Sequence, residues 1–169
     1  HLIEDANPWV FNSQVSKGTP SWLTLHRYLQ DPNPTASCIQ QLRSSGYEIA
    51  VTSPHVNGKE VHELPIDRPI ALVMGTEFEG VSDTFLEAAD HHVYIPMAGF
   101  AESLNISVAA GIIMHDLSRR THELPDSTWS LTEAEKAELR AHWAMKTVRK
   151  SEVILKQLKI CPNTGNPLA

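Results

Sequence analysis

The sequence predicts an α/β fold with a mostly parallel sheet and helices on both of its faces. Apolar, β-rich runs alternate with helical patterns along most of the chain, which is the order that βαβ units produce. The run at residues 70–74 is apolar at every position, as is typical of strands covered on both faces in a parallel sheet. A length of 169 residues suits one compact unit of this class.

The first half of the chain shows this alternation from its start. Residues 1–4 open as a strand, and residues 22–25 form a short strand candidate after a polar loop. An Asp-Pro-Asn-Pro run then breaks the chain, and Thr35 opens a helix that stops at Gly46, because glycine favours the position after a helix end. Residues 47–52 follow as a strand.

The second half continues in the same order. Ser82 begins a helix that its hydroxyl can cap, and residues 92–96 form the next strand. Residues 103–120 predict a helix that is apolar on nearly every side, so we expect it to be deeply buried. A capping-box pattern at residues 130–133 introduces a long, amphipathic and basic helix over about 131–158.

Charge is unevenly distributed along the chain. A net charge of -6 argues against nucleic acid as a partner, because phosphate contacts need Lys and Arg. Residues 131–160, however, hold seven Lys or Arg and four Glu, a net of +3 against -9 for the remainder. Such an imbalance can mark an interaction surface, although a solvated helix face is the commoner explanation.

Several other classes of protein and site are disfavoured. No apolar stretch is long enough to span a bilayer, so we expect no membrane segment. Cys38 and Cys161 lie far apart without a partner at ligand spacing, which gives neither a disulfide framework nor a metal site. We therefore expect no metal and a cytoplasmic location.

Two Gly- and Pro-marked segments, residues 72–80 and 93–107, carry most of the functional information. Each reads as a strand that runs into a loop and then a helix, which exposes backbone N–H and C=O groups at the carboxyl end of a strand. Neither is a G-x-G-x-x-G dinucleotide fingerprint or a G-x-x-x-x-G-K-[ST] phosphate loop. The segments therefore predict a ligand site of another kind.

The order of residues in these segments is specific. The chain has Met-Gly-Thr-Glu-Phe-Glu-Gly at 74–80, Ile-Pro-Met-Ala-Gly at 95–99 and Ser-Leu-Asn-Ile-Ser at 103–107. This pattern resembles motifs 2 and 3 of the SpoU (TrmH-like) branch of the SPOUT methyltransferases: a G-x-E-x-x-G loop, an I-P-M loop and an S-L-N-x-S helix start. The resemblance covers about 50 residues, from 72 to 120.

The resemblance implies an S-adenosylmethionine-dependent RNA 2'-O-ribose methyltransferase that works as a homodimer, with tRNA as its first candidate substrate and ribosomal RNA as its second. It also implies a C-terminal trefoil knot, which pattern reasoning alone would reject because threaded chains are rare. We expect a catalytic domain at 1–125, its N-terminal part missing, and a basic helical extension at 126–169 that contacts RNA.

Site residues follow from their places in the motifs. Glycine lets main chain approach a ligand closely, and apolar side chains supply the walls of a pocket. The residues assigned to the cofactor are Met74, Gly75, Glu77, Ile95, Met97, Ser103 and Leu104. Catalytic support is assigned to Glu77, Ser103 and Asn105, with Ser103 and Asn105 positioning the substrate ribose and Glu77 organising its loop. Lys17, Arg119 and Arg120 are assigned to RNA.

The proton acceptor for the ribose hydroxyl is missing from this assignment. The family places an arginine of an N-x-x-A-x-x-R motif in that role, ahead of the strand that residues 1–4 resemble, and this sequence contains no such motif. A neutral hydroxyl is a poor nucleophile, so methyl transfer needs the proton to leave. We expect the sequence to be truncated upstream rather than the protein to lack the base.

Plainer interpretations stay open for each residue. Ser103 and Asn105 could only cap a helix, Glu77 could pair with an arginine, and Arg119 and Arg120 suit the end of a helix. His91 and His92 are expected before a strand, as surface residues. For the whole chain, the alternatives are a catalytically silent RNA-binding or assembly protein of the same fold, and a generic α/β domain for another small ligand.

Overall fold

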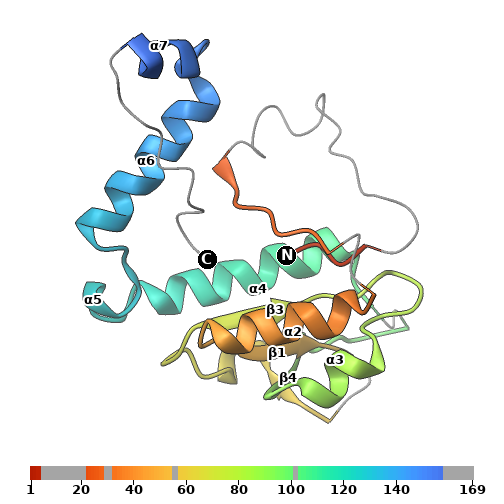
Figure 1. Ribbon diagram of the computed structural model, residues 1–169. Helices are drawn as coiled ribbons and strands as arrows, with labels where there is room; N and C mark the ends of the chain where they lie inside the picture. Colours follow the sequence, from red (N-terminus) through yellow and green to blue (C-terminus); the bar gives the residue numbers. More distant parts are fainter. Residues whose placement is uncertain (5–21, 29–31, 55–56, 101–102, 158–169) are drawn as a thin grey trace.

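A computed structural model describes residues 1–4, 22–28, 32–54, 57–100 and 103–157. Its centre is a four-stranded, wholly parallel sheet in the order β2-β4-β1-β3 (Figure 1). The strands are β1 (Glu48–Thr52), β2 (Lys59–Glu60), β3 (Ile70–Val73) and β4 (His91–Tyr94). The predicted mostly parallel sheet is therefore confirmed, and β1 is its best-paired strand, between β4 and β3.

Helices cover both faces of this sheet, as predicted. On one face α2 (Pro34–Ser44) and α3 (Asp83–Ala88) pack against Ile49 and Val51 of β1. On the other face the short 3-10 helix η2 (Val61–Glu63) and α4 (Ile106–Thr121) pack against Ala50. Successive strand residues point to opposite faces, so the three central residues of β1 serve both cores and are fully buried.

Local signals explain where α2 begins and ends. Asn33 caps it, since its side-chain oxygen accepts a hydrogen bond from Ala36 N at 3.2 Å, and Pro34 occupies the first turn, where no N–H is needed. After the helix Gly46 adopts φ +80°, a conformation that suits glycine. The cap predicted for α3 is wrong in detail: Ser82 stands at the cap position, but its hydroxyl makes no capping hydrogen bond.

The C-terminal helical region is not the single helix expected over 131–158. It consists of α5 (Asp126–Trp129), α6 (Glu133–Thr147) and α7 (Ser151–Gln157), which extend away from the sheet in Figure 1. The break between α6 and α7 contains Lys150 at φ +60°, outside helical geometry. The capping box is made by Thr132 and Glu135, two residues later than predicted.

The start of the chain pairs differently from the prediction. Residues 22–25 form no strand; instead Leu2 and Arg27 form an isolated parallel bridge, in which Leu2 N donates to His26 O at 2.8 Å. The Glu4 carboxylate is buried and forms an ion pair with Arg27. The pairing with the start of the chain is therefore made by Arg27, two residues after the end of the predicted strand.

Helix α4 is much less buried than its apolar sequence predicts. Of its side chains only Ile113 is buried, whereas Val108, Ile112 and Met114 are 50%, 43% and 58% exposed. The helix packs on the sheet through one side, and nothing within the described ranges covers the other. The prediction of deep burial is therefore wrong for this chain on its own.

None of the helices among the described residues combines the length and the apolar character that crossing a bilayer requires.

Candidate active site

The two motif segments emerge at the same edge of the sheet. The first follows β3 and the second follows β4, and these strands flank β1 on either side. In a parallel sheet, connections that diverge from a central strand open a crevice at the carboxyl ends of the strands. The topology therefore brings the motif segments to one candidate ligand site.

The first loop is a closed ring of backbone contacts. Thr76 N donates to Gly80 O at 2.9 Å and Gly80 N donates to Thr76 O at 3.1 Å, while Glu79 N donates to the Thr76 hydroxyl at 3.1 Å. Gly75 lies against the end of this ring, where an added Cβ would come within 2.1 Å of the Gly80 carbonyl carbon. Only glycine fits at position 75 while the ring stays closed.

The other two loop glycines have a different reason. Gly80 at φ +70° and Gly99 at φ +101° adopt conformations that L side chains rarely take, and both have open space beyond their α-carbons. The space beside their α-carbons is therefore open, while the Gly80 N–H and C=O pair with Thr76. Close approach of main chain to a ligand stays a prediction at Gly80 and Gly99, whereas Gly75 is in contact with its own loop.

A side-chain hydrogen bond joins the two segments. Asn105 Nδ2 donates to Glu77 Oε1 at 3.2 Å, across 28 residues of sequence. The same Asn105 caps α4, since its Oδ1 accepts from Ser107 N at 2.9 Å. The capping interpretation of Asn105 is therefore correct, and its amide nitrogen still holds Glu77. Within the part of the chain that the structure describes, Glu77 forms no ion pair with an arginine.

The remaining residues assigned to the cofactor fall into two groups. Met74 and Ile95 are half-buried and pack against the core under α4. Met97 is 37% exposed, Leu104 is half-buried and Ser103 is exposed. The loops thus have apolar side chains where they leave the strands and exposed or polar side chains farther along. This combination of apolar and polar groups is expected of a small-molecule site.

The three residues assigned to RNA differ in what the structure shows. Lys17 lies outside the described residues. Arg119 is 56% exposed and pairs with Glu123 at 2.8 Å. Arg120 is largely buried and donates to the carbonyl oxygens of Val61 and Leu64. Arg120 therefore fastens α4 to the η2 turn, and its proposed contact with RNA phosphate would compete with these bonds.

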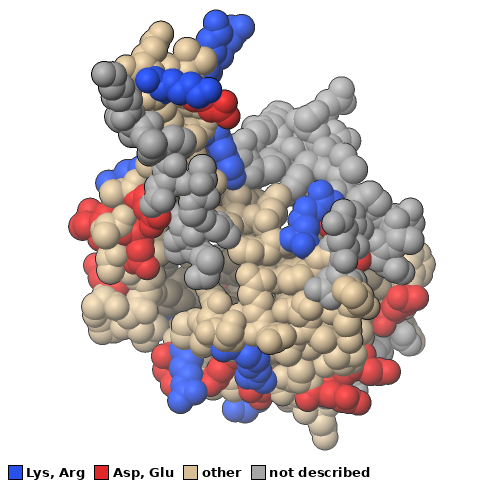
Figure 2. Space-filling model, in the orientation of Figure 1, with Lys and Arg blue, Asp and Glu red and all other residues tan. Residues whose placement is uncertain are grey.

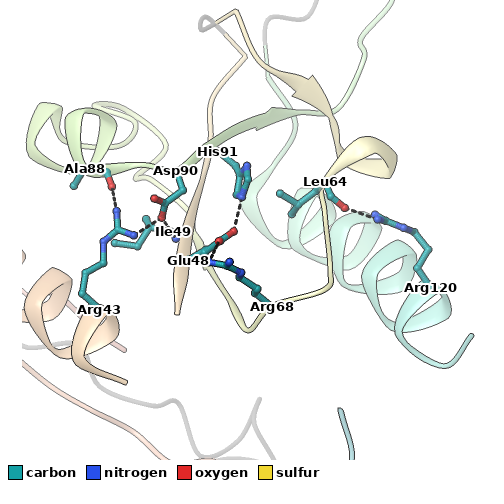
Figure 3. A network of polar contacts seen from close by, with 9 residues as sticks. All are labelled: Arg43, Glu48, Ile49, Leu64, Arg68, Ala88, Asp90, His91 and Arg120. Carbon is teal, nitrogen blue, oxygen red and sulfur yellow. Dashed lines mark hydrogen bonds and ion pairs between the residues drawn. The ribbon is translucent and has the colours of Figure 1, made fainter. Parts of the chain in front are cut away.

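At the opposite edge of the sheet lies a polar network (Figure 3). Asp90 Oδ2 accepts from Ile49 N at 2.7 Å and from Arg43 Nη1 at 2.6 Å, and Arg43 also donates to Ala88 O. Beside it, the Glu48 carboxylate accepts from Arg68 at 3.1 Å and faces His91 Nε2 at 2.8 Å. We call these five charged or titratable side chains the amino-end network.

Burial acts on the pKa of Asp90 in one direction, and hydrogen bonding and nearby positive charge act in the other. Desolvation favours the neutral acid, but the Ile49 N–H and the Arg43 guanidinium stabilise the carboxylate more, so the pKa of Asp90 lies below its ordinary value. The carboxylate is therefore the form that joins β1, β4 and α2.

The expectation for the two adjacent histidines is wrong. His91 and His92 are the first residues of β4 rather than residues ahead of it, and the His91 side chain is only 17% exposed. His92 Nδ1 is buried and has no hydrogen-bond partner among the described residues. The prediction was wrong because histidine is polar and was not expected inside a strand. The strand begins at His91, one residue before the predicted start at residue 92.

Two aromatic residues of the motif loops received no role from the sequence. Phe78 and Phe100 are 98% and 107% exposed. Their only sequence signal is their place inside the loops, since phenylalanine is usually interpreted as core.

Comparison with known proteins agrees with this geometry. The tRNA (guanosine(18)-2'-O)-methyltransferase of Borreliella burgdorferi is 36% identical over 154 residues, 91% of this chain and 68% of that protein. The enzyme of the same name from Aquifex aeolicus is 32% identical over 140 residues, 82% of this chain and 64% of that protein. The chain thus spans about two thirds of the length of these relatives.

Solved structures show the same fold. The A. aeolicus TrmH/SpoU tRNA modifying enzyme superposes with a TM-score of 0.68 at 28% identity, covering 83% of this chain and 70% of that one. The SpoU methyltransferase AviRb from Streptomyces viridochromogenes gives a TM-score of 0.54 at 29% identity, covering 65% and 43%. Residues 4–115, which include both motif loops and most of α4, match the SpoU rRNA Methylase family. The chain belongs to the SpoU methylase family.

Proposed function

We propose that this chain is the cofactor- and ribose-binding part of an S-adenosylmethionine-dependent RNA 2'-O-ribose methyltransferase that acts on tRNA. The single observation that carries the proposal is the Glu77–Asn105 hydrogen bond, which fastens the G-x-E-x-x-G loop to the S-L-N-x-S helix start. Family membership and the names of the relatives support the reaction and the substrate.

The residues present suit the proposed cofactor. Adenosylmethionine has an adenine edge, a ribose and a sulfonium, which need exposed backbone groups beside apolar walls more than side-chain charge. Open space lies beside the α-carbons of Gly80 and Gly99, where main chain can approach a ligand closely, and Met74, Ile95 and Leu104 supply apolar walls. When bound, the cofactor supplies an electrophilic methyl group.

The chain's own residues then position the acceptor. We assign Ser103 and Asn105 to the substrate ribose, because both precede α4 at the carboxyl edge of the sheet and both are exposed. Glu77 holds the Asn105 amide in place. The reaction forms a bond from the ribose O2' to the methyl carbon, breaks the carbon–sulfur bond and releases the hydroxyl proton.

The C-terminal region at 126–169 is proposed as an RNA-contacting extension of a catalytic domain at 1–125. Basic side chains lie at the end of α6, just before α7 and on α7, which also carries Glu152, whereas acidic ones gather near the start of α6 (Figure 2). The contributing basic residues are Lys146, Arg149, Lys150 and Lys156. Positive side chains spaced along the end of α6 and α7 can contact successive phosphates of an RNA backbone.

A homodimer and a C-terminal trefoil knot complete the proposal. The exposed apolar side chains of α4 support the dimer, because Ile106, Val108, Ile112 and Met114 are 37% to 58% exposed on one helix and exposed apolar clusters often mark a protein-binding surface. Sedimentation of the protein as a monomer at micromolar concentration would contradict it. The cytoplasmic location stays a prediction from cysteine use.

One experiment tests the activity. The full-length protein is incubated with methyl-labelled adenosylmethionine and bulk tRNA, and the digested product is analysed for 2'-O-methylated nucleosides. We expect label in one tRNA nucleotide, and less with ribosomal RNA. Label in no RNA would overturn the proposal.

A second candidate is a catalytically silent RNA-binding protein of the same fold. The observation that favours it is the lack of an N-x-x-A-x-x-R motif in the sequence. Reading the coding sequence upstream of His1 decides between them, because finding the motif there removes the reason for silence. Calorimetry addresses the generic ligand-binding alternative, which predicts binding of neither adenosylmethionine nor its demethylated product.

A further inference from the structure

Two aromatic side chains stand free at the candidate site. Phe78 is 98% exposed and Phe100 is 107% exposed, whereas the other large apolar side chains of the described residues are exposed by 58% or less. A phenylalanine ring with no protein against it adds nothing to the core. The fold therefore gives no reason for an aromatic residue at either position.

Both rings belong to the loops that bracket the site. Phe78 directly follows Glu77 in the loop after β3, and Phe100 lies five residues before Asn105 in the loop after β4. These strands flank β1, so the loops that carry the two rings leave the carboxyl edge of the sheet on either side of β1.

The backbone under Phe78 is held while its ring is free. The Thr76–Gly80 bridge closes the loop around it, and the Glu77–Asn105 bond ties that loop to α4. Phe100 follows Gly99, whose φ of +101° turns the chain sharply. A ring presented on a fixed loop loses little conformational freedom when a ligand covers it.

The proposed reaction modifies the ribose of one nucleotide of an RNA. Proteins that select a particular RNA nucleotide mostly recognise single-stranded loops, bulges and ends, where the bases can be unstacked. Unstacked bases lose the favourable contact with their neighbours, which aromatic side chains replace by stacking.

We infer that Phe78 and Phe100 stack on unpaired bases of the RNA substrate, on either side of the nucleotide whose ribose is methylated. This inference rests on the proposed function. It is distinct from the apolar surface of α4, where several aliphatic residues share one helix and suit a protein partner. Single planar rings on separate loops instead suit single planar bases.

The test compares three substitutions at each position. Phe78→Ala and Phe100→Ala remove the ring, Phe→Leu keeps an apolar side chain without a stacking face, and Phe→Trp enlarges the face. The matched control is Tyr47→Ala, because Tyr47 is also an exposed aromatic residue but lies next to the amino end of β1. For each protein one measures tRNA affinity, the KM for tRNA, and adenosylmethionine affinity by calorimetry.

We expect each Ala variant to weaken tRNA binding and raise the KM for tRNA about tenfold or more, with adenosylmethionine affinity unchanged. Phe→Trp should restore binding and its fluorescence should be quenched by single-stranded RNA, whereas Phe→Leu should behave like Ala. Tyr47→Ala should match the wild type.

Other outcomes separate the two proposals. If the wild type methylates tRNA and both Ala variants do so equally well, the stacking inference is overturned and the proposed activity stands. Wild-type behaviour of the Phe→Leu variants would have the same consequence. A change of sedimentation coefficient in the Ala variants, with unchanged RNA affinity, would assign the rings to a protein partner and overturn stacking. Phe-dependent RNA binding without methyl transfer by the wild type would overturn the proposed activity and support stacking. No RNA binding by the wild type would overturn both.

Discussion

The two edges of one parallel sheet serve different purposes. At the amino ends of the strands, Asp90, Glu48 and their partners satisfy one another and bind β1 to β4 and α2. At the carboxyl ends, the loops use their hydrogen bonds to hold their own shape, and they leave open space beside two glycines and two exposed phenylalanine rings. Polar groups that pair within the protein stabilise it, whereas groups left open are available to a ligand.

This contrast predicts that substitutions at the carboxyl edge impair activity more than stability, and the largest effect is expected at Asn105. Asn105→Ser keeps a good helix cap, but its shorter side chain does not reach the Glu77 carboxylate that Asn105 Nδ2 contacts at 3.2 Å. We expect methyl transfer to fall about 100-fold, because a positioning hydrogen bond is lost, while the free energy of unfolding changes by about 0.5 kcal/mol or less. Thermal unfolding and tRNA methylation of the same preparation measure the two quantities.

The control for this prediction is Glu77→Gln, whose side-chain oxygen can still accept the Asn105 amide N–H. It should retain more activity than Glu77→Ala. Equal loss in both would mean that Glu77 acts through its charge and not through the bond to Asn105.

The next largest effect is expected at Gly75, in the loop after β3. Gly75→Ala places a Cβ within 2.1 Å of the Gly80 backbone, so the Thr76–Gly80 ring must open. We expect adenosylmethionine binding to weaken at least tenfold, with a loss of about 1–3 kcal/mol in unfolding free energy. Calorimetry and denaturant unfolding check both.

Gly99→Ala provides the contrast, because its Cβ meets open space and only its φ of +101° is unfavourable. Its destabilisation should stay near 1 kcal/mol. If the two variants were equally impaired, backbone conformation and not the closed ring would be the reason for Gly75.

Sequence reasoning located the carboxyl edge better than the amino edge. The motif loops carry glycines and a fixed order of residues, so the sites at Glu77 and Asn105 could be named from the chain alone. Asp90 and Glu48 pair with residues 20 to 47 positions away, and no local pattern shows such partners. The exposure of α4 could not be predicted either, because its sequence is equally apolar on the side that the sheet leaves open.

Substitution in the amino-end network should have the opposite signature. Asp90→Asn keeps an oxygen for Ile49 N–H but loses the charge that binds Arg43. We expect a destabilisation of about 1–2 kcal/mol at pH 7, with adenosylmethionine affinity unchanged. Hydrogen bonds to charged groups contribute about 1.5–3 kcal/mol, and solvent screens this pair because the Arg43 and Asp90 side chains are 42% and 29% exposed. Denaturant unfolding beside calorimetry tests this, and a tenfold change in cofactor affinity would mean that the two edges are coupled.

The smallest effect is expected in the pH dependence of the difference in unfolding free energy between the wild type and Asp90→Asn. The pKa of Asp90 is lowered in the folded chain, so the folded state holds its proton less tightly than the unfolded state does. The contribution of Asp90 is therefore fully present above the unfolded pKa of about 4 and is lost as the pH falls through the lower folded value. Glu133 and Glu135 on α6 also have lowered pKa values and give both proteins an acid-side slope. The unfolding free energies of wild type and Asp90→Asn should thus differ by a constant amount from pH 6 to 7.5 and converge below about pH 4. A gap that stays constant through the acid range would mean that the Asp90 charge does not stabilise the sheet.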